Sequence, residues 1–345
     1  MVSGDILILK GHEVLSLLGG RENQIIETVR MAYEAHSVGE SSLPHSTFLR
    51  FPENDRDRII ALPAYLGQDF KIAGVKWVSS FPGNLELGLD RASAVVILNS
   101  VATGRMEAII EGSIISAKRT AASAALAAKV LHDKKDSTTA GMIGCGLINL
   151  EIARFLRAAR PDVKSFIVFD LDAARAAQFR DRCLDAFGDV EVSVASDVKD
   201  VFSNASLISI ATTAIKPHIA DLSDCSPGST ILHISLRDLT PEVILSCDNV
   251  VDDVDHVCRA ETSVHLAEKM TGDREFIRCT LADVLRGREA RRKTAGGITV
   301  FSPFGLGVLD MAVAGTVRDL ALESNVGTVM TSFLPEPLSE KARHM

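Results

Sequence analysis

Residues 139–149 read TAGMIGCGLIN, and this stretch decides the fold. Its first part, residues 139–143, is a short apolar run of the kind that forms a buried strand. The segment 147–160 has apolar residues at helical spacing and is followed by Pro161, which cannot continue a helix. The order of strand, glycine turn and helix predicts one end of a βαβ unit.

The glycine turn between these elements has the spacing of a dinucleotide-binding loop. Gly144 permits a tight turn, and Gly146 lets the backbone approach a pyrophosphate at the helix N-terminus. Leu147 and Ile148 open the helix and supply its first amides. Asn149 replaces the third glycine of the usual pattern, which weakens the match. A helix start in a fold without a cofactor is the alternative interpretation.

An acidic residue at the end of the next strand supports the first interpretation. Asp170 follows the apolar run 165–169 and lies 24 residues beyond Gly146, close to the spacing of about 20 at which an acid binds a ribose 2′-hydroxyl. A carboxylate there repels a 2′-phosphate, so NAD is favoured over NADP, although Arg175 lies nearby. The expected cofactor is therefore NAD.

Beyond Asp170, the pattern of strands alternating with helices continues along the chain. Further apolar runs that we expect to be strands are residues 190–195, 207–211, 230–234 and 250–251. This alternation predicts an α/β fold with a Rossmann-type doubly wound parallel sheet. The first 130 residues instead mix helical and β-like patterns, typical of an α+β domain. An alanine-rich helix over 113–131 and an apolar helix over 305–322 complete the prediction.

Composition limits the classes of function. A chain of 345 residues predicts about two domains. The net charge of −8 argues against a nucleic-acid-binding surface. The six cysteines have no metal-ligand spacing, so we expect reduced thiols and no metal site. The first residues lack the pattern of an export signal and no apolar stretch is long enough for a membrane span, so we expect a cytoplasmic protein.

Four basic residues interrupt apolar or β-like runs in the part of the chain before the glycine turn. They are Arg50, Lys76, Arg91 and Arg119. Taken singly, each is more often a solvated or structural charge. Together, in an acidic protein, they indicate a clamp for a substrate with several carboxylates, because the arginine fork matches carboxylate geometry.

Asp238 is the candidate acid/base. It follows the strand 230–234, and the carboxyl ends of strands line the ligand crevice of open α/β sheets. A cap for the turn before Pro241 is the alternative role. His233, on the strand itself, is interpreted as a core histidine.

The whole chain resembles the ornithine cyclodeaminase/mu-crystallin family. The segments that carry the resemblance are Gly74-Val75-Lys76-Trp77, Lys118-Arg119-Thr120-Ala121-Ala122, Gly144-Cys145-Gly146, Asp238, and Ser302-Pro303-Phe304-Gly305 with Asp310. Within the family it is most similar to the dehydrogenases that make 2,3-diaminopropionate for siderophores and peptide antibiotics. The segments that carry this closer similarity are Arg58-Ile59-Ile60-Ala61-Leu62-Pro63, Arg91-Ala92-Ser93, Val96-Ile97-Leu98-Asn99 and Val251-Asp252-Asp253.

The resemblance implies a role for each candidate residue. Asp238 and Lys76 are the catalytic residues, Asp238 exchanging the proton. Lys76, Arg50, Arg119 and Phe304 contact the substrate, with Arg119 on its α-carboxylate. The resemblance implies that NAD is contacted by the residues of the glycine turn, Asp170, Thr212, Ser235 and Arg91.

The resemblance also implies a reaction and an assembly. The reaction is NAD-dependent oxidative cleavage of N-(2-amino-2-carboxyethyl)-L-glutamate to 2-oxoglutarate and L-2,3-diaminopropionate. Alternatives are ornithine cyclodeamination to proline and ammonia, ketimine reduction, and a non-catalytic role in binding a nucleotide and a small ligand. Residues 1–125 with 312–345 are expected to bind substrate and form a homodimer, and residues 126–311 to bind NAD.

Overall fold

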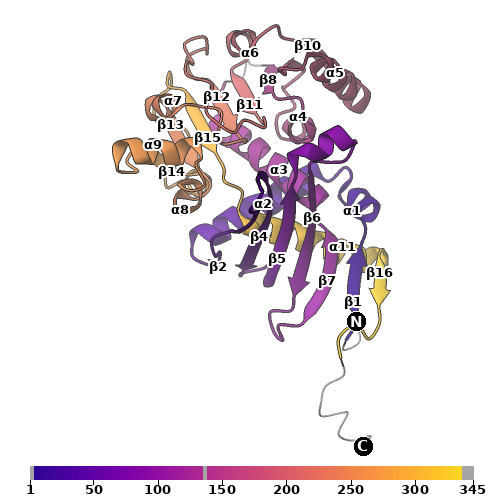
Figure 1. Cartoon of the computed structure of the whole chain (residues 1–345). Coiled ribbons are helices and arrows are strands. Elements are labelled where there is room, and N and C mark those ends of the chain that lie inside the picture. The colour runs from indigo at the N-terminus through magenta and orange to yellow at the C-terminus, as the bar shows by residue number, and fades with distance from the viewer. Residues whose placement is uncertain (1–3, 135–137, 336–345) are drawn as a thin grey trace, which may run out of the picture. The chain divides into compact units, whose positions relative to one another are not determined.

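The computed structural model describes residues 4–134 and 138–335, and these form two compact units (Figure 1). Unit 1 consists of the described residues within 1–21, 38–116 and 307–345, and unit 2 of those within 22–37 and 117–306. Helix α2 (Glu22–Ser37) therefore belongs to unit 2 although unit 1 residues flank it on both sides.

Unit 1 is built on an eight-stranded sheet. Its strands are β1 (Ile6–Leu9), β2 (Ser41–Ser42), β3 (Thr47–Phe51), β4 (Asn54–Leu66), β5 (Ile72–Ser80), β6 (Ala92–Asn99), β7 (Met106–Glu111) and β16 (Thr328–Met330). The order is β16-β1-β7-β6-β5-β4-β2, with β3 also paired to β4, and all pairs are antiparallel except β1 with β7. The unit also contains helix α1 (Gly11–Leu18) and the 3₁₀ helix η1 (Pro82–Leu87).

Helix α11 (Gly307–Ser324) covers one face of this sheet, over β4, β5 and β6. Small residues allow the close approach. A side-chain carbon at Gly315 would lie 2.7 Å from Cδ1 of Ile72, and one at Gly307 would lie 3.3 Å from the Ala64 side chain. The helix is buried over most of its length, so this face of the sheet forms the core of unit 1.

Unit 2 is built on an eight-stranded sheet whose strand pairs are all parallel. Its strands are β8 (Thr139–Ile143), β9 (Ser165–Phe169), β10 (Glu191–Val194), β11 (Leu207–Ile210), β12 (Thr230–His233), β13 (Asp248–Val251), β14 (Ile277–Thr280) and β15 (Thr299–Ser302). The order is β10-β9-β8-β11-β12-β15-β13-β14. The chain order reverses between β8 and β11, and at such a switch point the carboxyl ends of two strands form a ligand crevice.

Unit 2 also contains helices, most of which follow strands of this sheet along the chain. They are α2, the larger part of α3 (Ser113–Leu131), α4 (Leu147–Ala159), α5 (Ala173–Phe187), α6 (Val198–Asn204), α7 (Pro241–Ser246), α8 (Val254–Val257), α9 (Ser263–Thr271) and α10 (Leu281–Leu285). None of the helices in the described parts of the chain is both long and apolar enough to span a membrane.

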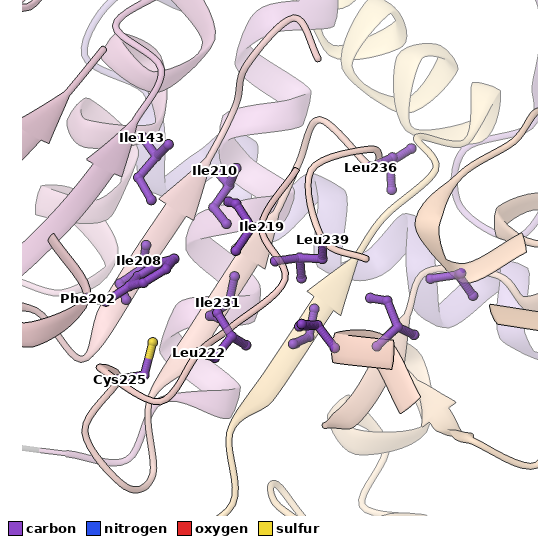
Figure 2. Close-up of a cluster of buried hydrophobic side chains, with 14 of the residues drawn as sticks. Ile143, Phe202, Ile208, Ile210, Ile219, Leu222, Cys225, Ile231, Leu236 and Leu239 are labelled. Carbon is purple, nitrogen blue, oxygen red and sulfur yellow. The ribbon is translucent and has the colours of Figure 1, made fainter. Parts of the chain in front are cut away.

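A hydrophobic cluster fixes the loops at the switch point. Ile208 and Ile210 of β11 and Ile231 of β12 are fully buried in it. Figure 2 shows Ile219 and Leu239 close to these strands, and the two residues form a β-bridge. The cluster thereby attaches the chain segments after β11 and β12 to the sheet.

The predicted fold class is confirmed: a doubly wound parallel sheet accompanies an α+β unit. The predicted strand 139–143 and helix 113–131 are present with the same bounds. Strands β14, β15 and β16 and helix α1 were not predicted. Strand β13 begins two residues earlier than expected.

Buried cations close the end of α3. Arg160 donates to the carbonyl of His132 at 2.9 Å, and Arg292 donates to the carbonyl of Leu131 at 3.0 Å. Positive charge is favourable there because a helix C-terminus carries partial negative charge. Nδ1 of His132 lies 3.1 Å from Oγ1 of Thr230. Burial, and then the charges of Arg160 and Arg292, lower the pKa of His132 to about 4.

We expect this histidine to destabilise the fold in acid. An unfolded histidine has a pKa near 6.5, so between pH 6.5 and 4 the unfolded chain binds the extra proton and the free energy of unfolding falls as pH falls. His132 alone should cost about 2 kcal/mol between pH 7.5 and 5. The variant His132→Asn should show a smaller pH dependence in urea unfolding. The exposed His12→Asn is the control, and an equal loss in His132→Asn and the parent would contradict the prediction.

Candidate active site

The glycine turn follows β8 at the switch point. Gly144 has φ of +90°, and a side-chain carbon there would lie 2.5 Å from the carbonyl oxygen of Ala211, directly after β11. Only glycine meets both conditions. A side-chain carbon at Gly146 would meet nothing within 4 Å, so the backbone is open to an approaching ligand at this position.

The N-terminus of α4 differs from the helix starts that follow it in unit 2. Side-chain oxygens cap α5, α6, α7, α8, α9 and α10, at Asp172, Asp197, Thr240, Asp253, Thr262 and Thr280. Helix α4 instead starts after Gly146 with no side-chain cap, and Leu147 at its first position is exposed. The first amides of α4 are therefore available to an external acceptor, and a pyrophosphate fits this position.

Asn149 holds the turn in the position of the missing third glycine. Its buried Nδ2 donates to the carbonyls of Ile143 at 2.9 Å and Gly144 at 2.7 Å, and its Oδ1 accepts from the Ser209 hydroxyl at 2.7 Å. All three partners belong to β8, β11 or the turn. The substitution that weakened the sequence pattern thus stabilises the loop rather than disrupting it.

Asp170 lies beside the turn, at the end of β9. Its Oδ2 accepts from the backbone nitrogen of Cys145 at 2.8 Å, and its Oδ1 accepts from that of Asp172 at 3.1 Å. These bonds orient the carboxylate at the edge of the switch point. Each oxygen has a further lone pair, so the group can also accept hydrogen bonds from the hydroxyls of a ribose.

Two flanking leucines fix Asp238 in the loop after β12. Leu236 and Leu239 are buried in the cluster of Figure 2, and Asp238 between them is fully buried. Leu236 has φ of +68°, a left-handed conformation that is strained for leucine. Strain of this kind persists only where surrounding packing imposes it, and it is found at functional sites.

Hydroxyl groups surround the Asp238 carboxylate. Thr212, after β11, donates to Oδ1, and Ser235, after β12, donates to Oδ2. Burial opposes ionisation of Asp238, but the proximity of His233 and the two hydroxyl donors outweigh it and hold its pKa below the ordinary value. The group is therefore an ionised base at neutral pH.

His233 is in contact with this carboxylate. Its Nε2 lies 3.4 Å from Oδ2 of Asp238 and 3.2 Å from the Asp238 backbone nitrogen, while its Nδ1 lies 3.2 Å from Oγ of Ser302 on β15. The histidine is fully buried, as expected for a core residue, but it also positions the candidate base.

Arg119 and Phe304 lie in the same unit. Arg119 is buried near the start of α3, and its guanidinium lies against Gly305, where a side-chain carbon would come within 2.8 Å of Nη1. The carboxylate of Asp252, after β13, accepts from the backbone nitrogens of Phe304 at 2.9 Å and Gly305 at 2.8 Å. Asp252 therefore positions the loop against which Arg119 rests.

Lys76 occupies the core face of the unit 1 sheet. It is almost completely buried, and its Nζ lies 2.8 Å from Oδ2 of Asp310 on α11 and 3.1 Å from Oγ of Ser116. Asp310 is fully buried too. Sequence reasoning gave Asp310 no role, although an acid inside an apolar helix was a signal that it has a charged partner.

Arg50 and Arg91 also lie in unit 1, and so does a third arginine, Arg58. The Cα atoms of Arg50 on β3 and Arg58 on β4 are directly paired across the strands. Arg91 immediately precedes β6. Among the side chains that the structure describes, no carboxylate forms an ion pair with any of these arginines. Arg58 was part of a sequence motif but was not predicted as a site residue.

Comparison with known proteins assigns the chain to a family. The pattern of the ornithine cyclodeaminase/mu-crystallin family matches residues 7–325. N-((2S)-2-amino-2-carboxyethyl)-L-glutamate dehydrogenase of Staphylococcus aureus (strain NCTC 8325 / PS 47) is 30% identical over 324 residues, which cover 91% of this chain and 95% of that protein.

Two solved structures are similar over nearly their whole length. The Delta(1)-pyrroline-2-carboxylate reductase of Thermococcus litoralis, in complex with NADH and L-proline, is 27% identical, with a TM-score of 0.87 and coverage of 94% of this chain and 99% of that one. An archaeal alanine dehydrogenase dimer with bound NAD is 28% identical, with a TM-score of 0.84 and coverage of 95% and 99%. The sequence and the fold agree, and the chain belongs to the ornithine cyclodeaminase/mu-crystallin family.

Proposed function

We propose that the protein is an NAD-dependent oxidoreductase acting on the CH–NH group of an amino acid, and that its substrate is N-(2-amino-2-carboxyethyl)-L-glutamate. The observation that carries the substrate is the group of Arg50, Arg58 and Arg91 in unit 1, because none of the three forms an ion pair with a carboxylate among the described side chains of an acidic protein. A substrate with three carboxylates supplies the missing anions. The identity to the Staphylococcus aureus dehydrogenase supports the same choice.

NAD fits the carboxyl edge of the unit 2 sheet. The uncapped amides after Gly146, at Leu147 and Ile148, would hold the pyrophosphate, and Asp170 would hold the ribose. Bound NAD supplies a hydride acceptor. Because Thr212 and Ser235 give their hydroxyl hydrogens to Asp238, only their oxygen lone pairs are left to contact the cofactor as acceptors. Arg91 is proposed as a further cofactor contact.

The residues of this chain position the substrate and move its proton. Arg119 holds the α-carboxylate, Arg50 a further carboxylate, and Phe304 forms a wall of the pocket. Lys76 lies against the reacting carbon and amine, kept in place by Asp310. Such positioning is a large part of catalysis, because the reaction requires a near-attack geometry.

Asp238 takes the proton from the secondary amine while the glutamate Cα loses a hydride, so that a C=N bond forms. Water then adds to this carbon and the C–N bond breaks. The products are 2-oxoglutarate, L-2,3-diaminopropionate, NADH and one proton. An ionised base such as Asp238 can accept the proton at neutral pH.

One assay tests the proposal against its rivals. The protein is incubated with NAD and either N-(2-amino-2-carboxyethyl)-L-glutamate or L-ornithine, and NADH and products are measured. NADH and 2-oxoglutarate from the first substrate support the proposal. Proline and ammonia from ornithine without net NADH identify a cyclodeaminase. NADH consumption with Delta(1)-pyrroline-2-carboxylate identifies a ketimine reductase, and NAD binding without turnover identifies a ligand-binding protein.

We expect Asp170→Asn to weaken NAD binding. A hydrogen bond to a charged group contributes about 1.5–3 kcal/mol, so its loss should raise the Kd for NAD about tenfold or more. The discrimination against NADP should fall too, since the negative charge is removed. Asp172→Asn is the matched control, because asparagine still caps α5. Titrations with NAD and with NADP measure the Kd of each cofactor for the parent and for the variants. If the ratio of the two Kd values in Asp170→Asn equals that of the parent, the assignment is contradicted.

The assembly and location follow from the same proposal. We assign NAD binding to unit 2, and homodimerisation, together with the substrate contacts of Arg50 and Lys76, to unit 1. The dimer in the similar archaeal alanine dehydrogenase structure supports the oligomeric state. The cysteines of the chain are free thiols, as is usual for the cytoplasm, where we place the protein. Sedimentation analysis of the purified protein tests the dimer.

A further inference from the structure

Arg58 belongs to a row of residues that crosses the unit 1 sheet. Arg50 on β3 is paired with Arg58 on β4, Arg58 with Ser80 on β5, and Ser80 with Ala92 on β6. Residues paired in this way lie on the same face of the sheet. Arg91 precedes Ala92, and its guanidinium is near enough to Arg58 for the charge of Arg58 to lower its pKa.

The same face carries Lys76. Lys76 is paired with Leu62, and Leu62 lies four residues after Arg58 on β4 without a change of register between them. Side chains four residues apart point to the same side, and they are separated by roughly 13 Å along the strand. Long lysine and arginine side chains can therefore contact the two ends of one extended small molecule.

The charges in this row are poorly compensated. Nε of Arg58 and Nε of Arg91 are buried without a hydrogen-bond partner among the described residues. Burial, and then the charge of Arg50, lower the pKa of Arg58, while burial and then Arg58 lower that of Arg91. Like charges held this close together in a partly buried position are unfavourable unless an anion joins them.

The strand geometry supports a built site rather than a chance cluster. The register of β3 with β4 shifts directly after Arg50, between Arg50 and Phe51. Irregularities of this kind re-aim side chains and occur next to active sites. The Arg50 guanidinium also lies 5.5 Å from the centre of the Phe48 ring, which holds it over the same face.

We infer that Arg58, together with Arg50, forms a subsite for a carboxylate of the substrate remote from the reacting carbon, and that Arg58 determines specificity for it. The inference rests on the proposed function, which supplies a substrate with two such carboxylates: one on the glutamate side chain and one on the diaminopropionate part. Arginine binds either of them by paired N–H donors. A neutral group there would leave the neighbouring charges of Arg50 and the partly buried Arg58 uncompensated.

The experiment uses Arg58→Gln and two substrate analogues. In each analogue one remote carboxylate is replaced by a carboxamide. The parent enzyme should lose about tenfold or more in kcat/KM with the analogue that lacks the bound carboxylate. Arg58→Gln should lose this discrimination for that analogue alone, which identifies the carboxylate. Unchanged discrimination against both analogues, or a raised KM for NAD with normal discrimination, would overturn the inference.

Two controls make the result specific. Arg21→Gln removes the same charge at an exposed position of unit 1 and should leave the discrimination intact. Arg58→Lys keeps the charge without the paired donors, and it should discriminate less than the parent and more than Arg58→Gln. It also serves if Arg58→Gln does not fold.

A binding measurement separates this inference from the proposed function. Calorimetric titration with 2-oxoglutarate and, separately, 2,3-diaminopropionate requires no turnover. If the assay shows no oxidation but Arg58→Gln weakens binding of one of these carboxylates at least tenfold, the subsite stands and the proposed reaction is wrong. If the parent oxidises the substrate but Arg58→Gln binds both compounds as the parent does, the proposed reaction stands and the subsite is wrong.

Discussion

Asp238→Asn should reduce kcat by about 10²–10⁴-fold while leaving NAD binding close to that of the parent. Asparagine has nearly the same shape, and its single side-chain oxygen can still accept a hydrogen bond from Thr212 or Ser235. Its amide nitrogen accepts no hydrogen bond, and the group cannot take a proton from the substrate amine. Steady-state rates with N-(2-amino-2-carboxyethyl)-L-glutamate and a cofactor titration measure the two effects. Asp221→Asn, on the surface of the same unit, is the control. Turnover within a few-fold of the parent would exclude Asp238 as the base.

The environment of Asp238 provides a second measurement of its role. Removing one hydroxyl donor with Ser235→Ala takes away a bond that favours the carboxylate, so the pKa of Asp238 should rise. The base is active only when ionised. The acid limb of the kcat/KM profile should therefore move to higher pH in Ser235→Ala. An acid limb that does not move would show that another group controls it.

The second large effect concerns the buried pair of Lys76 and Asp310. Removal of one partner from a buried ion pair costs about 3–5 kcal/mol, because the other charge remains buried and uncompensated. Asp310→Leu and Lys76→Met should each destabilise the protein by this amount. The double variant should recover most of the loss, since replacing a buried pair by apolar side chains is often neutral. Urea unfolding of the four proteins completes a double-mutant cycle.

In this double-mutant cycle, enzyme activity should not be restored together with the free energy of unfolding. Lys76 is proposed to contact the reacting carbon and amine, so the stable double variant should remain inactive. Recovery of both stability and activity would show that Lys76 serves the fold alone. A double variant no more stable than Asp310→Leu would show that the two side chains do not stabilise each other. The two readouts therefore separate folding from catalysis at one position.

The parts of the fold that sequence analysis predicted depend on local chemistry. The glycine turn, the helix after it and the alternation of elements follow from residue types a few positions apart. Strand β15 was not predicted from the sequence. Its place between β12 and β13 depends on pairing with distant segments.

The site shows the same division. Asp238 and Asp170 were predicted as site residues because they follow predicted strands in a fold whose strand ends bind ligands. His233 was interpreted only as a core residue, because its contact with Asp238 depends on how the next loop turns back. Asp310 and Arg58 needed the tertiary structure, since one meets Lys76 across a helix–sheet interface and the other meets Arg50 through strand register.

The division of unit 1 along the chain has a consequence for protein synthesis. Ile6 pairs with Met330, and α11 is needed to cover β4, β5 and β6, but nearly all of unit 2 is translated between β7 and α11. At about 5–20 residues per second, the N-terminal strands emerge from the ribosome roughly 10–40 s before the helix that covers them. The parallel sheet of unit 2, whose strands are encoded without interruption, can form during this delay. We therefore expect the face of the unit 1 sheet that α11 covers to remain without this helix until α11 is synthesised.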